Sequence, residues 1–137
     1  FLQYFKPDIK FVPIVLSHAG GAIYQEIGRG IAQAIKKLNR EVVILASSDM
    51  THYESDESAR QKDARALEAI LALNEEELLK RVQELNITMC GYAPAVSLIT
   101  AAKELGAGQA ELVKYQTSGD TSGDYRSVVG YAGAVLT

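Results

Sequence analysis

The residues best suited to chemistry lie at positions 47–53, directly after the apolar run at residues 42–46. This segment holds Asp49 and, three positions later, His52, which is one of only 2 histidines in the chain. A carboxylate and an imidazole on one loop can bind a divalent metal, or the carboxylate can orient the imidazole for acid–base catalysis. Ligands bind beyond the carboxyl ends of strands in α/β proteins, so the position favours a site. The alternative is that Asp49 caps the loop or the next helix and that His52 only hydrogen-bonds to the backbone.

Cys90 is the single cysteine, and it precedes Gly91 and a predicted helix. A thiol at a helix N-terminus has its thiolate stabilised by the helix dipole, which favours metal binding or nucleophilic reactivity. The alternative is a small buried hydrophobic side chain. Gly91 and Pro94 indicate a shaped turn here, which favours the functional interpretation.

The remaining polar positions give weaker signals. His18 lies in a glycine-containing turn without the spacing of a dinucleotide or phosphate-binding loop, so we expect a loop residue beside the pocket. Ser47 and Ser48 are poor candidates for a nucleophile, because catalytic triads draw their members from separate elements. The polar loop at residues 115–125 lacks the order of an EF-hand calcium site. The residues that we expect to line a polar pocket are Ser48, Tyr53, Tyr115, Ser118 and Tyr131.

Alternating strands and helices must position these residues. The apolar runs at residues 11–16 and 41–46 have strand length, and the second is of the kind buried on both faces of a sheet. Apolar residues elsewhere recur at helical or strand spacing. Helices are expected at residues 22–38, 56–72, 75–85 and 93–105, and closing strands at residues 110–115 and 127–136. The pattern predicts a single α/β domain over residues 1–137, a three-layer α/β/α arrangement with a mostly parallel sheet.

Three helix ends have local signals. Residues 39–40, Asn-Arg, are expected to stop the first helix. Asp56 or Ser58 could cap the second. Asn74, with Glu77 three residues later, fits a capping box that opens the third.

Composition excludes several classes of partner. The 137 residues carry 14 basic and 17 acidic side chains, and this net charge of -3 gives no electrostatic case for binding nucleic acid or an anionic membrane surface. No apolar run approaches the roughly 18 residues that span a bilayer. A single cysteine cannot form an internal disulfide, so we expect a cytoplasmic protein. The opening residues 1–7 are unusually apolar, which indicates a piece of a longer chain.

Four ordered motifs together resemble the Memo family, whose prokaryotic members are called AmmeMemoRadiSam system protein B. The motifs are Ser48-Asp49-x-x-His52-Tyr53, Cys90-Gly91-x-x-Pro94, Tyr115-x-x-Ser118-Gly119-Asp120 and Ser127-Val128-Val129-Gly130-Tyr131-Ala132. Their order and spacing match across essentially the whole chain. Family chains are about twice as long, so the sequence resembles a C-terminal half.

The resemblance implies a fold similar to class III extradiol ring-cleaving dioxygenases, which use non-haem iron. It also implies a pocket that binds iron or copper, with zinc as an alternative, and with Asp49, His52 and Cys90 as metal ligands or catalytic acid–base groups. The other pocket histidines of the family belong to its N-terminal half, and His18 matches no family site. Three ligands are fewer than a closed tetrahedral site requires, and the two-His-one-carboxylate iron site cannot be built from this chain alone. We therefore expect weak metal binding, little activity and a tendency to associate.

Three functions are compatible with the resemblance. The first is a metal-dependent redox or oxygenase-type enzyme. The second is a non-catalytic module that binds a peptide or protein in the same cavity, because animal family members are linked to phosphotyrosine-peptide binding. The third is an accessory protein to a radical-SAM partner. The expected partners are an unidentified small-molecule or peptide ligand, and either a second copy of the chain or the N-terminal half of a family chain.

Overall fold

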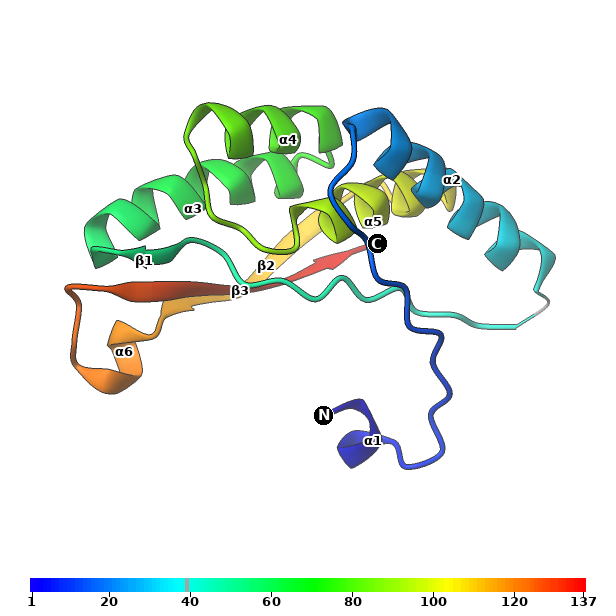
Figure 1. Cartoon of the computed structure of the whole chain (residues 1–137). Helices are drawn as coiled ribbons and strands as arrows, with labels where there is room; N and C mark the ends of the chain where they lie inside the picture. The colour runs from blue at the N-terminus through cyan, green and yellow to red at the C-terminus, as the bar shows by residue number, and fades with distance from the viewer. Residues whose placement is uncertain (39) are drawn as a thin grey trace.

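The computed structural model describes residues 1–38 and 40–137, which have a mixed α/β architecture (Figure 1). Helical and strand segments alternate only in part, because three helices between residues 56 and 104 follow one another with no strand between them. In order, the elements are α1 (Leu2–Phe5), α2 (Gly21–Lys37), β1 (His52–Glu54), α3 (Asp56–Leu71), α4 (Glu75–Glu84), α5 (Tyr92–Glu104), β2 (Ala110–Thr117), α6 (Gly119–Ser122) and β3 (Val128–Leu136).

The strands in the described residues form a small open sheet with the order β1-β3-β2, and both pairings are antiparallel. The central strand β3 pairs with β2 along its length, with Tyr115 opposite Ala132. It pairs with β1 at its first residues, with His52 opposite Val129. Helices α2 to α5 lie on one side of this sheet, and α3 packs against all three strands (Figure 1). The sheet therefore connects α3 to the segment that carries His52.

The longer helices pack side by side in the spatial order α2, α5, α4 and α3. Apolar residues on their facing sides make the core, together with side chains from the segments that join them. The buried members of this core are Tyr24, Met50, Ala66, Leu67, Ala69, Leu78, Val82, Ile87, Met89, Ala93, Ala95, Val96 and Ile99. Met50 and Met89 are direct neighbours of Asp49 and Cys90, so the core anchors both segments that carry candidate site residues.

The helices expected from periodicity are confirmed as α2, α3, α4 and α5, and the closing strands as β2 and β3. The capping signal at Asn74 is also confirmed, since its Oδ1 accepts a hydrogen bond of 2.9 Å from the backbone N–H of Glu77. The predicted caps of α3 are wrong: Ser55 is the N-cap, and its Oγ accepts from the N–H of Ser58. The sequence predicted that residues 39–40 end the first helix, and of these two residues Asn39 lies outside the described residues.

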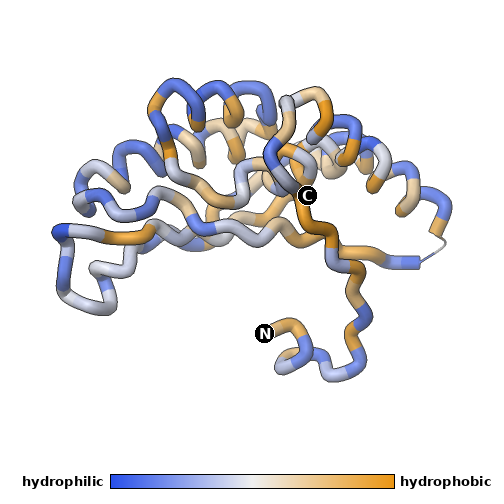
Figure 2. Tube along the Cα trace, in the orientation of Figure 1, coloured by the Kyte–Doolittle hydropathy of each residue, from blue (hydrophilic) through white to orange (hydrophobic). Residues whose placement is uncertain are grey.

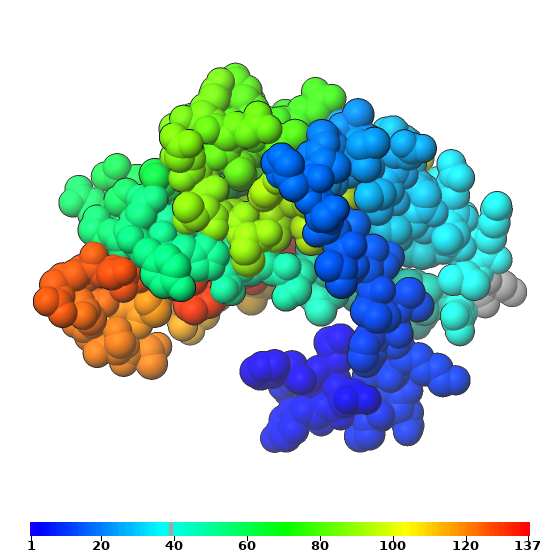
Figure 3. Space-filling view, in the orientation of Figure 1, coloured from blue at the N-terminus to red at the C-terminus, as the bar shows by residue number. Residues whose placement is uncertain are grey.

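The predicted strands at residues 11–16 and 41–46 are wrong. Both segments are extended, but among the described residues neither joins a sheet ladder. Val15 is 94% exposed and Val43 is 91% exposed, although the second run has the composition of a strand buried on both faces. Figure 2 shows these segments as largely hydrophobic, and Figure 3 shows the N-terminal residues projecting from the body of the molecule.

The three-layer arrangement with a mostly parallel sheet, similar to a ring-cleaving dioxygenase, is consequently not confirmed. A parallel central sheet needs strands that are paired at both edges and covered on both faces. Here the two apolar runs that were expected to supply those strands have no paired neighbour in the described residues, and the observed sheet is antiparallel. None of the helices in residues 1–38 and 40–137 combines the length and apolarity needed to cross a lipid bilayer.

Candidate metal-binding site

The segment that carries Asp49 and His52 is attached to the central strand by its two middle residues. The N–H of Met50 donates to the carbonyl of Gly130, and the N–H of Gly130 donates to the carbonyl of Thr51, both at 2.9 Å. Asp49 precedes this pair of residues and His52 follows it. The relative placement of the two candidate ligands is therefore set by a short piece of backbone held on β3.

A β-bulge at Tyr53 redirects the chain immediately after His52. The register with β3 shifts between His52 and Glu54, and Tyr53 has a φ of 59°, in the left-handed region. Its side chain is 81% exposed. Bulges of this kind re-aim neighbouring side chains and are common beside functional sites. With this bulge, the side chain of His52 faces the loop before α5, and the regular pairing of β1 with β3 is interrupted after His52.

Thr88 fixes the orientation of His52 through both its backbone and its ring. The N–H of His52 donates to Oγ1 of Thr88 at 2.7 Å, and Nδ1 of the ring lies 2.6 Å from the carbonyl oxygen of Thr88. A carbonyl only accepts, so Nδ1 carries the proton in this contact. The lone pair of the neutral ring is then on Nε2, which lies 3.5 Å from Oδ2 of Asp49. Metal-binding histidines are commonly oriented by such a bond from the other ring nitrogen to a carbonyl.

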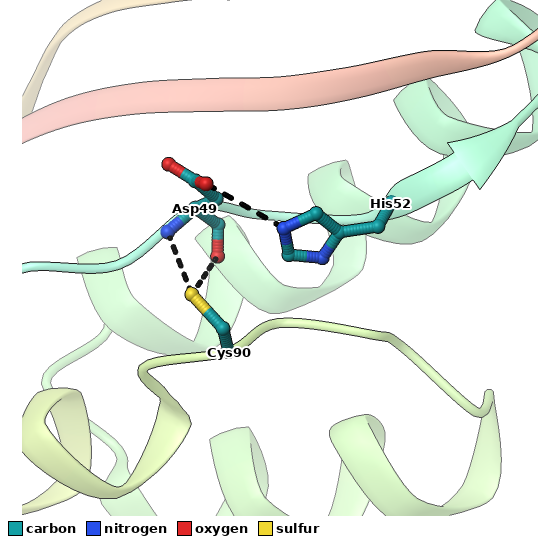
Figure 4. A group of neighbouring side chains, drawn as sticks. All are labelled: Asp49, His52 and Cys90. Atoms are coloured by element: carbon teal, nitrogen blue, oxygen red, sulfur yellow. Dashed lines mark hydrogen bonds and ion pairs between the residues drawn. The ribbon is translucent and has the colours of Figure 1, made fainter.

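Cys90 approaches the same group from the segment just before α5. Its Sγ accepts a hydrogen bond of 3.2 Å from the backbone N–H of Asp49 and lies 3.9 Å from the carbonyl oxygen of Asp49. Figure 4 shows the sulfur against the main chain of Asp49, while His52 faces the carboxylate. One ligand atom from each of Asp49, His52 and Cys90 lies within 4.8 Å of the other two. The structure thus brings together the three residues that sequence reasoning selected.

A contact between Ser48 and Gly91 holds the two loops together. The N–H of Gly91 donates to Oγ of Ser48 at 2.8 Å, and that hydroxyl donates to the carbonyl of Asp49 at 2.7 Å. A Cβ placed on Gly91 would overlap Ser48 and would lie 2.6 Å from the carbonyl oxygen of Ser47. Only glycine permits this approach of the backbones, so Gly91 determines how close Cys90 comes to Asp49.

The group is open to solvent. The side chain of Asp49 is 47% exposed, that of His52 is 20% exposed, and Cys90 is exposed. Part of each of the three side chains is therefore in contact with solvent.

The residues expected to line a pocket are distributed unevenly around this group. Ser48 lies at it, and Tyr53 lies beside His52 with its ring centroid 5.8 Å away. Tyr115 instead donates its hydroxyl to Oδ2 of Asp63 at 2.7 Å. Oγ of Ser118 accepts from the N–H of Val129, and Tyr131 is exposed on β3. His18, which we expected only beside the pocket, lies 3.0 Å from the hydroxyl of Tyr92.

Asp63 and Thr88 are the important residues that sequence reasoning missed. Asp63 is fully buried on α3 and accepts a hydrogen bond of 2.9 Å from the N–H of Thr51. Burial of the Tyr115 side chain is the main cause of its raised pKa, and the hydrogen bond to Asp63 raises the pKa further. The Tyr115 hydroxyl therefore keeps its proton and acts as a donor. A signal for Asp63 was present: it lies four residues after Ala59 and three before Ala66, on the inner face of a helix. Nothing in the sequence pattern distinguishes Thr88.

Comparison with known proteins gives a consistent set of matches. The family model described as Memo-like protein matches residues 1–135. A MEMO1 family protein of Methanocaldococcus jannaschii is 48% identical over 127 residues, which is 93% of this chain and 44% of the relative. One from Methanopyrus kandleri is 42% identical over 137 residues, or 99% and 48%. One from Methanococcoides burtonii is 44% identical over 137 residues, or 99% and 52%. The chain thus spans about half the length of the curated relatives that it matches.

Proposed function

Because this chain belongs to the Memo-like protein family, we propose that it is the metal-binding part of such a protein, with Asp49, His52 and Cys90 as ligands of iron or copper. The observation that carries this proposal is the convergence of three ligand atoms of different chemistry, all within 4.8 Å of one another. They come from two segments that are separated by about forty residues of sequence.

The donor set fits a transition metal. An imidazole nitrogen, a thiolate sulfur and a carboxylate oxygen suit iron, copper or zinc, and the sulfur favours Cu(I). Bonds of about 2.0–2.3 Å place tetrahedral ligand atoms about 3.5 Å apart. Nε2 of His52 and Oδ2 of Asp49 already lie 3.5 Å apart. Any wider separation, up to 4.8 Å, involves Sγ of Cys90, whose exposed side chain would turn toward the ion. Three protein ligands leave a coordination position open for a substrate or for a further ligand.

The residues around the ligands support the same function. Thr88 holds His52 with Nε2 available, and Ser48 with Gly91 holds Cys90 against Asp49. When bound, iron or copper with an open position supplies redox or Lewis-acid chemistry. We propose redox or oxygenase-type chemistry for the complete protein, in which this chain's residues orient the ion and keep one side of it open.

We further propose that the complete site forms when this chain packs against the remainder of a family chain. The relatives are about twice as long, and the resemblance assigns further pocket histidines to the part that these 137 residues do not cover. The exposed apolar segments at residues 11–16 and 41–46 supply a surface for that packing. A dioxygenase-like three-layer fold is proposed only for that complete assembly.

The test is metal content at equilibrium, measured by anaerobic dialysis against a known concentration of Fe(II) or Cu(I), so that a weakly bound ion is also counted. His52→Ala and Cys90→Ala are measured beside the unchanged chain, with His18→Ala as the matched histidine control. We expect up to one ion per chain, lost in both ligand variants and retained in His18→Ala. Absence of binding in the unchanged chain, or equal binding in all four proteins, would contradict the assignment.

A further inference from the structure

A buried carboxylate lies behind the candidate metal ligands. Asp63, at 0% exposure, faces the sheet from α3. Its Oδ1 accepts from the backbone N–H of Thr51 at 2.9 Å, and its Oδ2 accepts from the hydroxyl of Tyr115 at 2.7 Å. It also packs directly on Gly130, where any Cβ would overlap the carboxylate. Burying a carboxylate costs free energy unless hydrogen bonds compensate it, so these contacts hold Asp63 in one place.

The backbone that Asp63 holds is the piece that separates the two loop ligands. Met50 and Thr51 are tied to Gly130 by two hydrogen bonds, and the remaining N–H, that of Thr51, points to Asp63. Asp49 and His52 flank this pair. Fixing the Thr51 peptide therefore fixes the direction in which each ligand leaves the backbone.

We propose that Asp63 is a positioning residue for the metal group: its carboxylate, oriented by Tyr115, locks the Met50–Thr51 backbone and so sets the geometry of Asp49 and His52. This inference rests on the proposed function for its metal readout. Its structural content, that Asp63 fixes the ligand loop, is independent of any ion. The competing interpretation is that Asp63 merely attaches α3 to the sheet.

The test uses two conservative variants of the full chain. Tyr115→Phe removes only the hydroxyl that orients the carboxylate. Asp63→Asn keeps the shape but replaces one acceptor oxygen with a donor. Ser97→Ala is the control, because it removes a buried hydroxyl whose hydrogen bond to the carbonyl of Tyr24 joins α2 and α5, away from the ligand loop.

Two readouts are compared at a temperature where all variants are folded. The first is NMR of the ion-free proteins, following hydrogen exchange of the Thr51 N–H and the His52 Nδ1–H. We expect exchange at both positions to be at least about tenfold faster in Asp63→Asn and faster in Tyr115→Phe, with no change in Ser97→Ala. The second is the affinity for Co(II), read from its thiolate charge-transfer absorption. We expect a loss of about tenfold or more in Asp63→Asn, the size typical for residues that orient metal ligands.

The two claims fail in different ways. If the unchanged chain shows no Co(II)–thiolate absorption and takes up neither iron nor copper, the proposed function is wrong, while the exchange data still decide the role of Asp63. If exchange at Thr51 and His52 is the same in Asp63→Asn as in the unchanged chain, the inference is overturned. A loss of affinity in Ser97→Ala equal to that in Asp63→Asn would overturn it as well, because destabilisation alone would then explain the effect.

Discussion

The contact between Ser48 and Gly91 decides whether three ordinary side chains form a site. His52 and Asp49 share a loop, but Cys90 belongs to another segment and reaches them only because the two backbones touch. The contact depends on the absence of a side chain at Gly91. Its loss would separate the sulfur from the imidazole without touching any ligand.

Gly91→Ala is therefore expected to abolish metal binding, although all three candidate ligand residues are unchanged. The new methyl group would overlap Ser48, and relieving the overlap requires the loops to move apart. Overpacking of this kind costs about 1–3 kcal/mol, so the variant should remain folded with a lower melting temperature. Metal content after Cu(I) loading and thermal unfolding measure the two effects.

The matched control for this substitution is Gly108→Ala, where a Cβ would meet no atom within 4 Å. It should bind metal like the unchanged chain. Full metal binding in Gly91→Ala would show that the loops can separate without affecting the ligands, and that Ser48 and Gly91 do not assemble the site.

At the scale of elements, Arg60 connects α3 to the far end of the sheet. Its Nε donates to Asp56 at 2.6 Å, and one terminal nitrogen donates to both oxygens of Asp120 at 2.9 Å. Thr117 completes the cluster, with its hydroxyl donating to Asp56 and its N–H to Asp120. One helix, one strand and the short helix α6 thus meet in a single charged cluster.

This cluster predicts acid sensitivity. The pKa of Asp56 is lowered mainly by its hydrogen bond from Arg60 and less by the one from Thr117. The pKa of Asp120 is lowered mainly by the hydrogen bond from the N–H of Thr117 and less by the one from Arg60. A carboxylate whose pKa is lower in the folded state stabilises the fold above its unfolded pKa of about 4, and this stabilisation is lost as the pH falls through the folded pKa. Urea unfolding between pH 7 and pH 3 should show stability falling below about pH 4.

Replacing Arg60 distinguishes the contribution of this cluster to the acid sensitivity from the contribution of other carboxylates. Arg60→Gln should be less stable than the unchanged chain at neutral pH and should lose less stability on acidification, because part of the linkage has been removed. Arg29→Gln on α2, for which the described residues show no ion pair, is the control and should follow the unchanged chain. Parallel pH profiles for Arg60→Gln and the unchanged chain would refute the role of the cluster.

Elements were predictable from the sequence where the partner of each apolar face lies in the same chain. Helices α2 to α5 bury one side against one another, so their periodicity was sufficient. The run at residues 42–46 has an equally clear pattern. An apolar run predicts that a segment is buried, but it does not predict which other element covers that segment. The bulged strand β1 is too short and polar to give a signal. The pairing of His52 with Thr88, and of Ser48 with Gly91, depends on tertiary approach that spacing cannot show.

At the scale of the whole molecule, the chain exposes more surface than a complete domain of its size. Its accessible area is 8945 Å². A folded monomer of 14.8 kDa is expected to expose about 7,000 Å². The excess of roughly 2,000 Å² is the size of a permanent protein–protein interface. Much of it is apolar and lies on the extended segments, including Val15, Val43 and Leu45.

This surface predicts that the 137-residue chain associates with itself when it is alone. Burial of apolar area is favourable at about 25 cal/mol per Å², and nothing in the described residues covers these segments. Sedimentation velocity over a hundredfold range of concentration should show a shift to larger species. The double variant Val15→Thr, Val43→Thr should shift less, whereas Leu85→Thr, which changes the 39% exposed C-cap residue of α4, should not differ from the unchanged chain.

The same surface should prefer the remainder of a family chain over a second copy. The piece to add is the part of the Methanocaldococcus jannaschii relative that the match leaves uncovered, since the covered part is 48% identical to this chain. We expect co-expression to give a one-to-one complex that no longer self-associates and that binds metal more tightly than this chain alone, because a completed ligand set adds bonds to the ion.

The Val15→Thr, Val43→Thr variant should form this complex less well, and Leu85→Thr should form it normally. If self-association persists in the mixture and metal affinity is unchanged, the exposed segments serve pairing between copies of this chain, and the proposed site is limited to the three candidate ligands of this chain.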